Sequence, residues 1–162
     1  MIIVSACLLG LNTKYDGKAN AHALIQKYSS QGKFIPLCPE QLGGLPTPRT
    51  PVEIMAGTGQ DVLAGRCVVQ GEQGQDVTLQ FIQGAKEIVK IVEMVNVSAA
   101  ILKERSPSCG VNYIYDGCFS HRMIPGQGVT AAILKERKIP TYSEAELTEE
   151  RLMALLSDDE TS

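Results

Sequence analysis

Short apolar runs alternate along this chain with stretches in which apolar residues recur at helical spacing. The runs predict buried strands, at residues 1–6, 34–37, 97–102 and 141–142. The helical spacing predicts helices, at residues 21–28, 76–95, 129–137 and 143–156. Strands that alternate with helices favour an α/β fold. We therefore expect a single layered, Rossmann-like domain whose mainly parallel sheet is flanked by helices.

Other local signals complete this picture. Residues 43–51 predict a rigid Gly- and Pro-rich loop, residues 62–69 a hairpin with its turn at 71–74, and residues 106–128 an irregular segment. Asp76 is expected to cap the second helix, and Ser143 with Glu146 is spaced as a capping box for the last one. The domain is expected to span residues 1–157, with a frayed tail at 158–162.

One heptapeptide, Ala-Ala-Ile-Leu-Lys-Glu-Arg, occurs twice, at residues 99–105 and 131–137. The first copy is predicted to be a strand because it runs into Ser-Pro after a long helix. The second copy follows a Gly-rich turn, which favours a helix. A single pair is too little for a repeat architecture, and coincidence explains it adequately.

The charge and the apolar runs exclude some classes of function. The chain has 162 residues and a formal net charge of -3, which gives no sign of a basic surface for duplex nucleic acid. Its apolar runs are too short to span a membrane, and its N-terminus does not resemble a signal peptide. Five cysteines without an export signal predict a cytoplasmic protein with reduced thiols.

Three of the cysteines each follow a predicted strand. Cys7 and Cys38 come directly after their strands, and Cys109 follows its strand through the loop 103–108. Because the carboxyl ends of parallel strands meet at one edge of a sheet, the three thiols are expected to converge. Such a convergence suits a metal or cluster site with an open coordination position.

Spacing alone leaves several chemistries open. Four-cysteine zinc sites usually contain C-x-x-C pairs, which this chain lacks, although a zinc enzyme of similar layout stays an alternative. Three isolated thiolates suit a [4Fe–4S] cluster, in which one iron lacks a protein ligand and can act as a Lewis acid. A non-enzymatic redox sensor or cluster carrier uses the same ligands. In a fourth alternative the cysteines are only core residues.

The segments around these cysteines resemble the thiouracil desulfidases, a family first catalogued as a domain of unknown function. The resemblance spans nearly the whole chain and rests on five segments: SACLLG (5–10), YDG (15–17), CPEQLGGLPTPR (38–49), SPSCG (106–110) and GQGVTA (126–131). It implies a [4Fe–4S] cluster held by Cys7, Cys38 and Cys109. It also implies removal of sulfur from a small thiolated pyrimidine, either thiouracil or 4-thiouridine monophosphate. Water would attack the ring carbon, and sulfide would leave without net redox change.

Acid–base chemistry next to the cysteines has two candidates. Glu40 is expected either to activate water and shuttle protons or to accept hydrogen bonds from loop amides, and the resemblance favours catalysis. Ser106 is the preferred proton relay, with turn capping as its alternative role. Ser108, on the other side of Pro107, is a further candidate in the same loop.

Phosphate or substrate binding is expected from Arg49, Gln127, Gly128 and Ser108. The Arg49 guanidinium suits bidentate phosphate contact, although it suits a structural salt bridge equally. Gln127 and Gly128 precede a predicted helix whose amides suit an anion, with a simple turn as the alternative. A weaker case exists for Lys103 and Arg105, and for pyrimidine stacking on Tyr15 or Tyr115. Cys67 and Cys118 are interpreted as bystanders, although sulfide handling by Cys118 stays open.

Overall fold

The centre of the molecule is a four-stranded parallel sheet in the order β2-β1-β5-β8. The computed structural model describes residues 1–158. The strands are β1 (Ile2–Ser5), β2 (Phe34–Leu37), β5 (Ala99–Leu102) and β8 (Thr141–Ser143). The chain reverses its direction of winding between β1 and β5, the place where open α/β sheets bind ligands beyond the carboxyl ends of their strands. The predicted layered α/β fold is confirmed.

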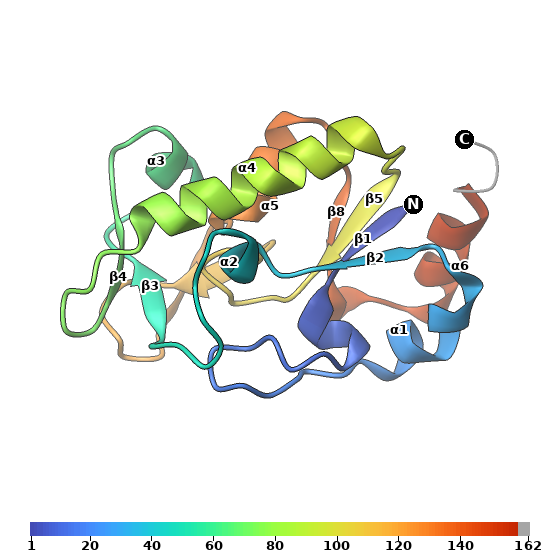
Figure 1. Ribbon diagram of the computed structural model, residues 1–162, viewed down its shortest axis with the longest axis horizontal. Helices are drawn as coiled ribbons and strands as arrows, with labels where there is room; N and C mark the ends of the chain where they lie inside the picture. The colour runs from blue at the N-terminus through green and yellow to red at the C-terminus, as the bar shows by residue number, and fades with distance from the viewer. Residues whose placement is uncertain (159–162) are drawn as a thin grey trace.

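Helices cover both faces of this sheet, as Figure 1 shows. They are α1 (Ala23–Tyr28), α4 (Thr78–Met94), α5 (Val129–Glu136) and α6 (Glu149–Asp158). Side chains alternate along a strand, so Ile2 and Val4 join one core with residues of α1 and α6. Ile3 faces the other way and joins a second core with residues of α4 and α5. The apolar runs of β1 and β5 are therefore strands that are buried on both faces, whereas β2 at the edge of the sheet is only partly buried.

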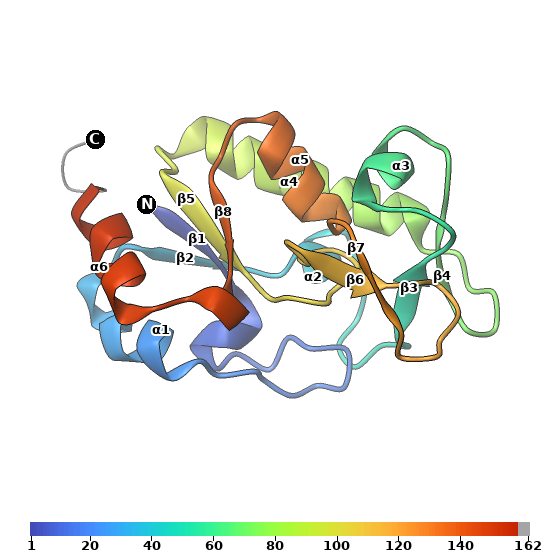
Figure 2. The same cartoon turned by 180° about the vertical axis from the view of Figure 1, so that it is seen from behind.

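A smaller region, which we call the outer lobe, lies beyond the carboxyl ends of the parallel strands (Figure 2). It contains two antiparallel pairs, of which one joins β3 to β4 and the other joins β6 to β7. Its elements are β3 (Val52–Ile54), α3 (Gly59–Leu63), β4 (Val69–Gly71), β6 (Tyr113–Tyr115) and β7 (Met123–Pro125). A third apolar core, which includes Ile54, Phe81 and Ile114, joins the lobe to α4.

Two of the local predictions in this region are wrong. Residues 62–69 do not form a hairpin, because Thr58 and Asp61 make a capping box that starts α3. β4 follows and pairs with β3, and the chain then turns at 71–74 as predicted, with an antiparallel bridge between Gln70 and Asp76 across the turn. The segment 106–128 is not wholly irregular, since it contains β6 and β7.

Helix capping follows the sequence at one place and departs from it at another. The carboxylate of Asp76 accepts the N–H of Thr78 at 2.9 Å, as expected of a cap for α4. Ser143 caps only a 3-10 turn, η3 (Glu144–Glu146), by accepting the N–H of Ala145. α6 begins later, where the hydroxyl of Thr148 accepts an amide of the first turn.

The two copies of the repeated heptapeptide adopt the two predicted structures. The first copy forms β5, and the second lies in α5. Among the helices of the described residues, none is both long and apolar enough to cross a bilayer. Asp158 ends α6, and the rest of the predicted frayed tail, residues 159–162, lies outside the described residues.

Candidate active site

The three strand-end cysteines line one cleft of about 520 Å³. Cys7 lies in η1 (Ala6–Leu9), the 3-10 turn that follows β1. Cys38 lies between β2 and the short helix α2 (Pro39–Leu42). Cys109 lies in the loop after β5 and is only 5% exposed. The structure thus brings together three thiols that are far apart in the sequence.

Burial dominates the chemistry of the two innermost thiols. It raises the pKa of Cys109 to about 12, although hydrogen bonds from Ser5 and Ser108 act in the opposite direction. Burial also raises the pKa of Cys7, against a hydrogen bond from Asn20. Negative charge on Cys38 raises both pKa values further, as expected of thiols that lie close together. Both groups are therefore neutral thiols in the metal-free protein, and any metal that they bind must displace their protons.

The donor set fits a cluster better than a single ion. Within residues 1–158, no group of three or more His, Cys, Asp or Glu side chains is arranged to hold one metal ion. In a [4Fe–4S] cluster each thiolate binds a different iron, so the ligands surround the cluster instead of one centre. Three thiols on three separate strand ends, facing one cleft, match that requirement.

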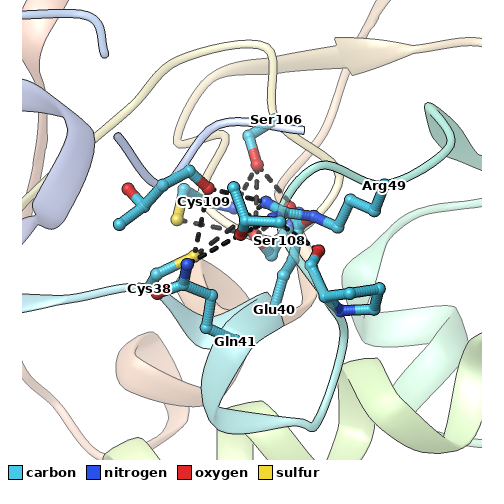
Figure 3. Close-up of polar contacts among 10 residues, drawn as sticks. Cys38, Glu40, Gln41, Arg49, Ser106, Ser108 and Cys109 are labelled. Atoms are coloured by element: carbon cyan, nitrogen blue, oxygen red, sulfur yellow. Dashed lines mark hydrogen bonds and ion pairs between the residues drawn. The ribbon is translucent and has the colours of Figure 1, made fainter. Parts of the chain in front are cut away.

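Glu40 lies beside Cys38 and is held by Arg49 (Figure 3). The two side chains form an ion pair, in which Arg49 Nε lies 2.5 Å from Glu40 Oε2. The side chain of Glu40 is only 13% exposed and that of Arg49 only 7%. The rest of the guanidinium donates to backbone and hydroxyl oxygens of Thr13, Pro46 and Thr47. Arg49 therefore orients Glu40 and fixes the loop around Cys38, which is the salt-bridge role that the sequence left open.

Ser108 connects Glu40 to Cys109. Its hydroxyl donates to Glu40 Oε1 at 3.1 Å and lies 3.6 Å from Cys109 Sγ. Ser106 Oγ accepts the N–H groups of Ser108 and Cys109 and lies 3.1 Å from Ser108 Oγ. Since Ser108 donates to Glu40, Ser106 is the donor between the two hydroxyls. Ser106 thus caps the turn, and Ser108 is the hydroxyl that reaches the carboxylate.

Glu104 organises the loop that carries these serines, and sequence reasoning missed it. Its buried carboxylate accepts the N–H groups of Val111, Asn112 and Tyr113, each at 3.0 Å. Burial raises the pKa of Glu104, but hydrogen bonds from Ser143 and from these amides outweigh it, so the net pKa is lowered. A hydrogen-bonded carboxylate therefore sets the shape of the loop. The sequence does not reveal this role, because only folding brings those amides to Glu104.

The N-terminus of α5 holds the same loop from beneath. The N–H groups of Val129 and Thr130 donate to the carbonyls of Pro107 and Ser108, at 3.0 and 2.8 Å. A Cβ on Gly128 would lie 2.5 Å from the carbonyl carbon of Ser108, so only glycine allows this approach. These amides were predicted to bind a phosphate, but the loop carbonyls occupy them. Gln127 bonds to Gln60 and lines a separate hollow, outside the cleft.

Cys67 and Cys118 do not join the other thiols, and neither lines the cleft. Cys67 lies between α3 and β4, where its sulfur is 3.8 Å from the carbonyl oxygen of Thr58. Cys118 is exposed in the β6–β7 connection, and its N–H donates to Asp116. The remaining charged groups of the cleft include Lys103, which is paired with Glu144, and Arg105.

A parallel α/β fold with three thiols and a carboxylate–hydroxyl network at its carboxyl edge defines a protein with a candidate cluster site. Residues 2–146 match the model of the 2-thiouracil desulfurase family, and the chain belongs to this family. It is 46% identical over 149 residues to the uncharacterized protein YbbK of Bacillus subtilis (strain 168), covering 92% of this chain and 99% of YbbK. It is also similar to a solved structure, the [4Fe-4S]-dependent thiouracil desulfidase TudS. That match has a TM-score of 0.82 and 38% identity, and it covers 95% of this chain and 96% of TudS.

Proposed function

We propose that this protein is a [4Fe–4S]-dependent desulfidase that removes sulfur from thiolated pyrimidines. The observation that carries the proposal is the convergence of Cys7, Cys38 and Cys109 on a cleft that also contains Glu40 and Ser108. Membership of the 2-thiouracil desulfurase family and the likeness to TudS support the same activity. In the reaction, the C=S bond of the substrate is replaced by a C=O bond from water, and hydrogen sulfide leaves. No electron is gained or lost overall.

The three cysteines would hold the cluster, and each would bind through its thiolate. A cluster bound by three thiolates supplies one iron that is open to a sulfur ligand and acts there as a Lewis acid. Cys7 and Cys109 are almost fully buried, so they would hold the cluster from the buried side of the cleft. Cys38 is half-buried and lies next to the ion pair of Glu40 and Arg49.

Glu40 is the group that we assign to proton transfer. Its carboxylate is anchored at Oε2 by Arg49 and at Oε1 by Ser108, so its orientation is fixed before a substrate enters. A carboxylate oxygen has further lone pairs, which leaves capacity to accept a proton from the attacking water. Preorganisation of this kind lowers the cost of reaching the productive geometry.

Ser108 is the relay that we assign next to Glu40, in preference to Ser106. Its hydroxyl donates to Glu40 Oε1 and lies 3.6 Å from Cys109 Sγ, so a proton taken by Glu40 could pass through it along the side of the cleft where the thiols lie. Ser106 keeps Ser108 in place, because its oxygen already accepts two amides.

The substrate class that we propose is the thiolated pyrimidine base itself. Arg49 and Ser108 are engaged with Glu40, the α5 amides near Gly128 are engaged with the Cys109 loop, and Gln127 lies outside the cleft. The four residues first predicted to bind a phosphate therefore each have another partner or place. Of the two weaker candidates, Lys103 is paired with Glu144, and Arg105 lines the cleft. The base needs only a planar space beside the thiols.

Anaerobic loading with iron and sulfide, followed by incubation with 2-thiouracil, tests the proposal. We expect uracil and sulfide to form in equal amounts without added oxidant or reductant. Protein that binds a cluster but releases no sulfide from thio-bases, thio-nucleosides or thio-nucleotides would contradict the proposed function. That result would instead favour a redox sensor or a cluster carrier.

A further inference from the structure

The cleft has a second wall, which is made of aromatic rings from the outer lobe. Tyr115, Phe119 and His121 all line it, and they come from the end of β6 and from the β6–β7 connection. Tyr115 and His121 meet edge to face, with ring centroids 6.2 Å apart and an interplanar angle of 83°. None of the three belongs to an apolar core cluster of the described residues. Core packing therefore does not explain why rings stand at these positions.

The backbone makes these positions costly for such residues. Phe119 has φ = 54° and His121 has φ = 60°, both in the left-handed region. Glycine adopts this region most readily, and Asn, Asp and His do so more often than other residues, whereas a bulky residue such as Phe119 is rarely found there. Strained residues persist where the surrounding structure holds them, and they concentrate at functional sites. The chain keeps two ring side chains where glycine would be easier, and both rings line the cleft.

Glu53 holds the loop in this conformation. Glu53 is only 8% exposed, and its carboxylate accepts the N–H of Gly117 at 2.9 Å and that of Phe119 at 3.2 Å. Gly117 packs so closely on β3 that a Cβ there would lie 2.6 Å from the carbonyl oxygen of Ile54. A buried carboxylate and a close backbone contact thus fix the amide of Phe119, and with it the direction in which the ring leaves the backbone.

We propose that the Phe119 ring is the surface on which the pyrimidine stacks, that Tyr115 and His121 bound its edge, and that Glu53 is a positioning residue for this wall. The inference rests on the proposed function, since it names where that site holds its substrate. Every pyrimidine has a flat π face, and stacking on an aromatic side chain is a general way to bind it. The thiols and Glu40 line the same cleft, so a ring stacked on Phe119 would lie in the space that they share.

The experiment uses the cluster-loaded protein and compares Phe119→Leu with Tyr113→Leu. Tyr113 is a matched control, because it is an exposed aromatic residue of the same hairpin that lines the separate hollow. Uracil, which contains no sulfur, probes binding by equilibrium dialysis, and 2-thiouracil gives KM and kcat. We expect Phe119→Leu to raise the Kd for uracil and the KM about tenfold, with kcat and iron content unchanged. Tyr113→Leu should change none of these values.

The role of Glu53 needs a readout other than turnover. Arg122 is exposed in the β6–β7 connection and offers a trypsin site there, while the exposed Arg66 between α3 and β4 serves as an internal control. Glu53→Gln should speed cleavage after Arg122 without speeding cleavage after Arg66. It should also raise the KM in the same sense as Phe119→Leu. Unchanged cleavage after Arg122 together with an unchanged KM would overturn the positioning role.

The outcomes separate this inference from the proposed function. If the wild-type protein releases sulfide and both Phe119 and Tyr113 variants keep its KM and uracil affinity, the stacking surface is wrong and the function stands. If the wild-type protein releases no sulfide but binds uracil, and Phe119→Leu weakens that binding, the stacking surface stands and the function fails. Wild-type protein that neither binds uracil nor releases sulfide would overturn both.

Discussion

Cysteines occur in two regions of this molecule, and the regions treat them differently. At the carboxyl edge of the parallel sheet, Cys7, Cys38 and Cys109 share one cleft. Outside that edge, Cys67 lies beside a backbone carbonyl and Cys118 is exposed on a loop. The residue type is the same in both regions. What differs is whether strand ends bring the thiol to a common space that also contains an oriented carboxylate.

This difference shows that the strand edge, and not the number of cysteines, defines the site. The sheet fixes where three strand ends meet, and the loops beyond the ends add Glu40, Ser108 and Arg49. Cys67 and Cys118 have no comparable surroundings among the described residues. The same substitution should therefore have different effects in the two regions.

The largest effect is expected from the cysteines themselves. Cys7→Ala, Cys38→Ala and Cys109→Ala should each abolish stable cluster binding, because each removes one of the three thiolate ligands. Cys67→Ala and Cys118→Ala should keep the iron content of the wild-type protein. Iron and acid-labile sulfide per chain, measured after anaerobic loading, decide the comparison. A variant set in which Cys67→Ala loses the cluster and Cys109→Ala keeps it would reverse our ligand assignment.

The next largest effect is expected at Glu40. Glu40→Gln preserves the shape of the side chain but removes its capacity to accept a proton, so kcat for 2-thiouracil should fall about 100-fold or more. The iron content should stay the same, and kcat is to be normalised to it. Glu72→Gln is the matched control, since Glu72 also lines the cleft but lies outside the Arg49 and Ser108 contacts. Equal turnover in the two variants would remove Glu40 from the reaction.

A smaller effect separates the two serines. Ser108→Ala should lower kcat about tenfold, because it breaks the contact between Glu40 and the Cys109 loop. Ser106→Ala leaves two loop amides without their acceptor, so it should mainly lower the free energy of unfolding, by about 1 kcal/mol. The opposite pattern, with turnover lost in Ser106→Ala and kept in Ser108→Ala, would restore Ser106 as the relay.

The smallest effect concerns stability and uses the repeated heptapeptide. Glu104→Gln should lower the free energy of unfolding by about 2 kcal/mol near neutral pH, because the buried carboxylate gathers several amides. Glu136, the corresponding residue of the second copy, is exposed, so Glu136→Gln should change little. Urea denaturation of the metal-free proteins measures both.

The stabilisation that Glu104 contributes should depend on pH in one direction. The folded-state pKa of Glu104 is lowered, whereas an unfolded glutamate has a pKa of about 4.3. The stabilisation is therefore fully present above the unfolded pKa and is lost as pH falls through the folded pKa. The difference in the free energy of unfolding between the wild type and Glu104→Gln should therefore narrow below a pH of about 4. A difference that stays constant as the pH falls well below that value would show that the charge of Glu104 does not stabilise the fold.

The sequence predicted the central sheet because its strands are continuous apolar runs with a strong local signal. The repeated heptapeptide shows that flanking residues matter as well as composition. The Gly-rich turn before one copy and the Ser-Pro after the other were enough to predict that the former is a helix and the latter a strand. The outer lobe was not predicted, because its strands are only three residues long, too short for a clear alternating pattern. Each pairs across an irregular connection or a short helix instead of a two-residue turn with a recognisable signature.

The residues of the candidate site also fall into two groups, those that the sequence predicts and those that it does not. Residues that follow strand ends, such as Cys38 and Cys109, are found from the sequence because the sheet edge alone places them. Glu104 and Glu53 were missed because their partners are backbone amides, which have no signature in the sequence. The phosphate expectation at Gly128 did not foresee that a neighbouring loop would occupy the helix N-terminus.

The central claim is that three thiolates hold a cluster whose remaining iron is open to the sulfur of the substrate. Mössbauer spectroscopy of protein loaded with ⁵⁷Fe tests it most directly, before and after addition of 2-thiouracil. We predict that the signal of about one iron in four changes, while the other three, which are bound by Cys7, Cys38 and Cys109, keep theirs. Four irons that respond alike, or a spectrum that 2-thiouracil leaves unchanged, would contradict the account.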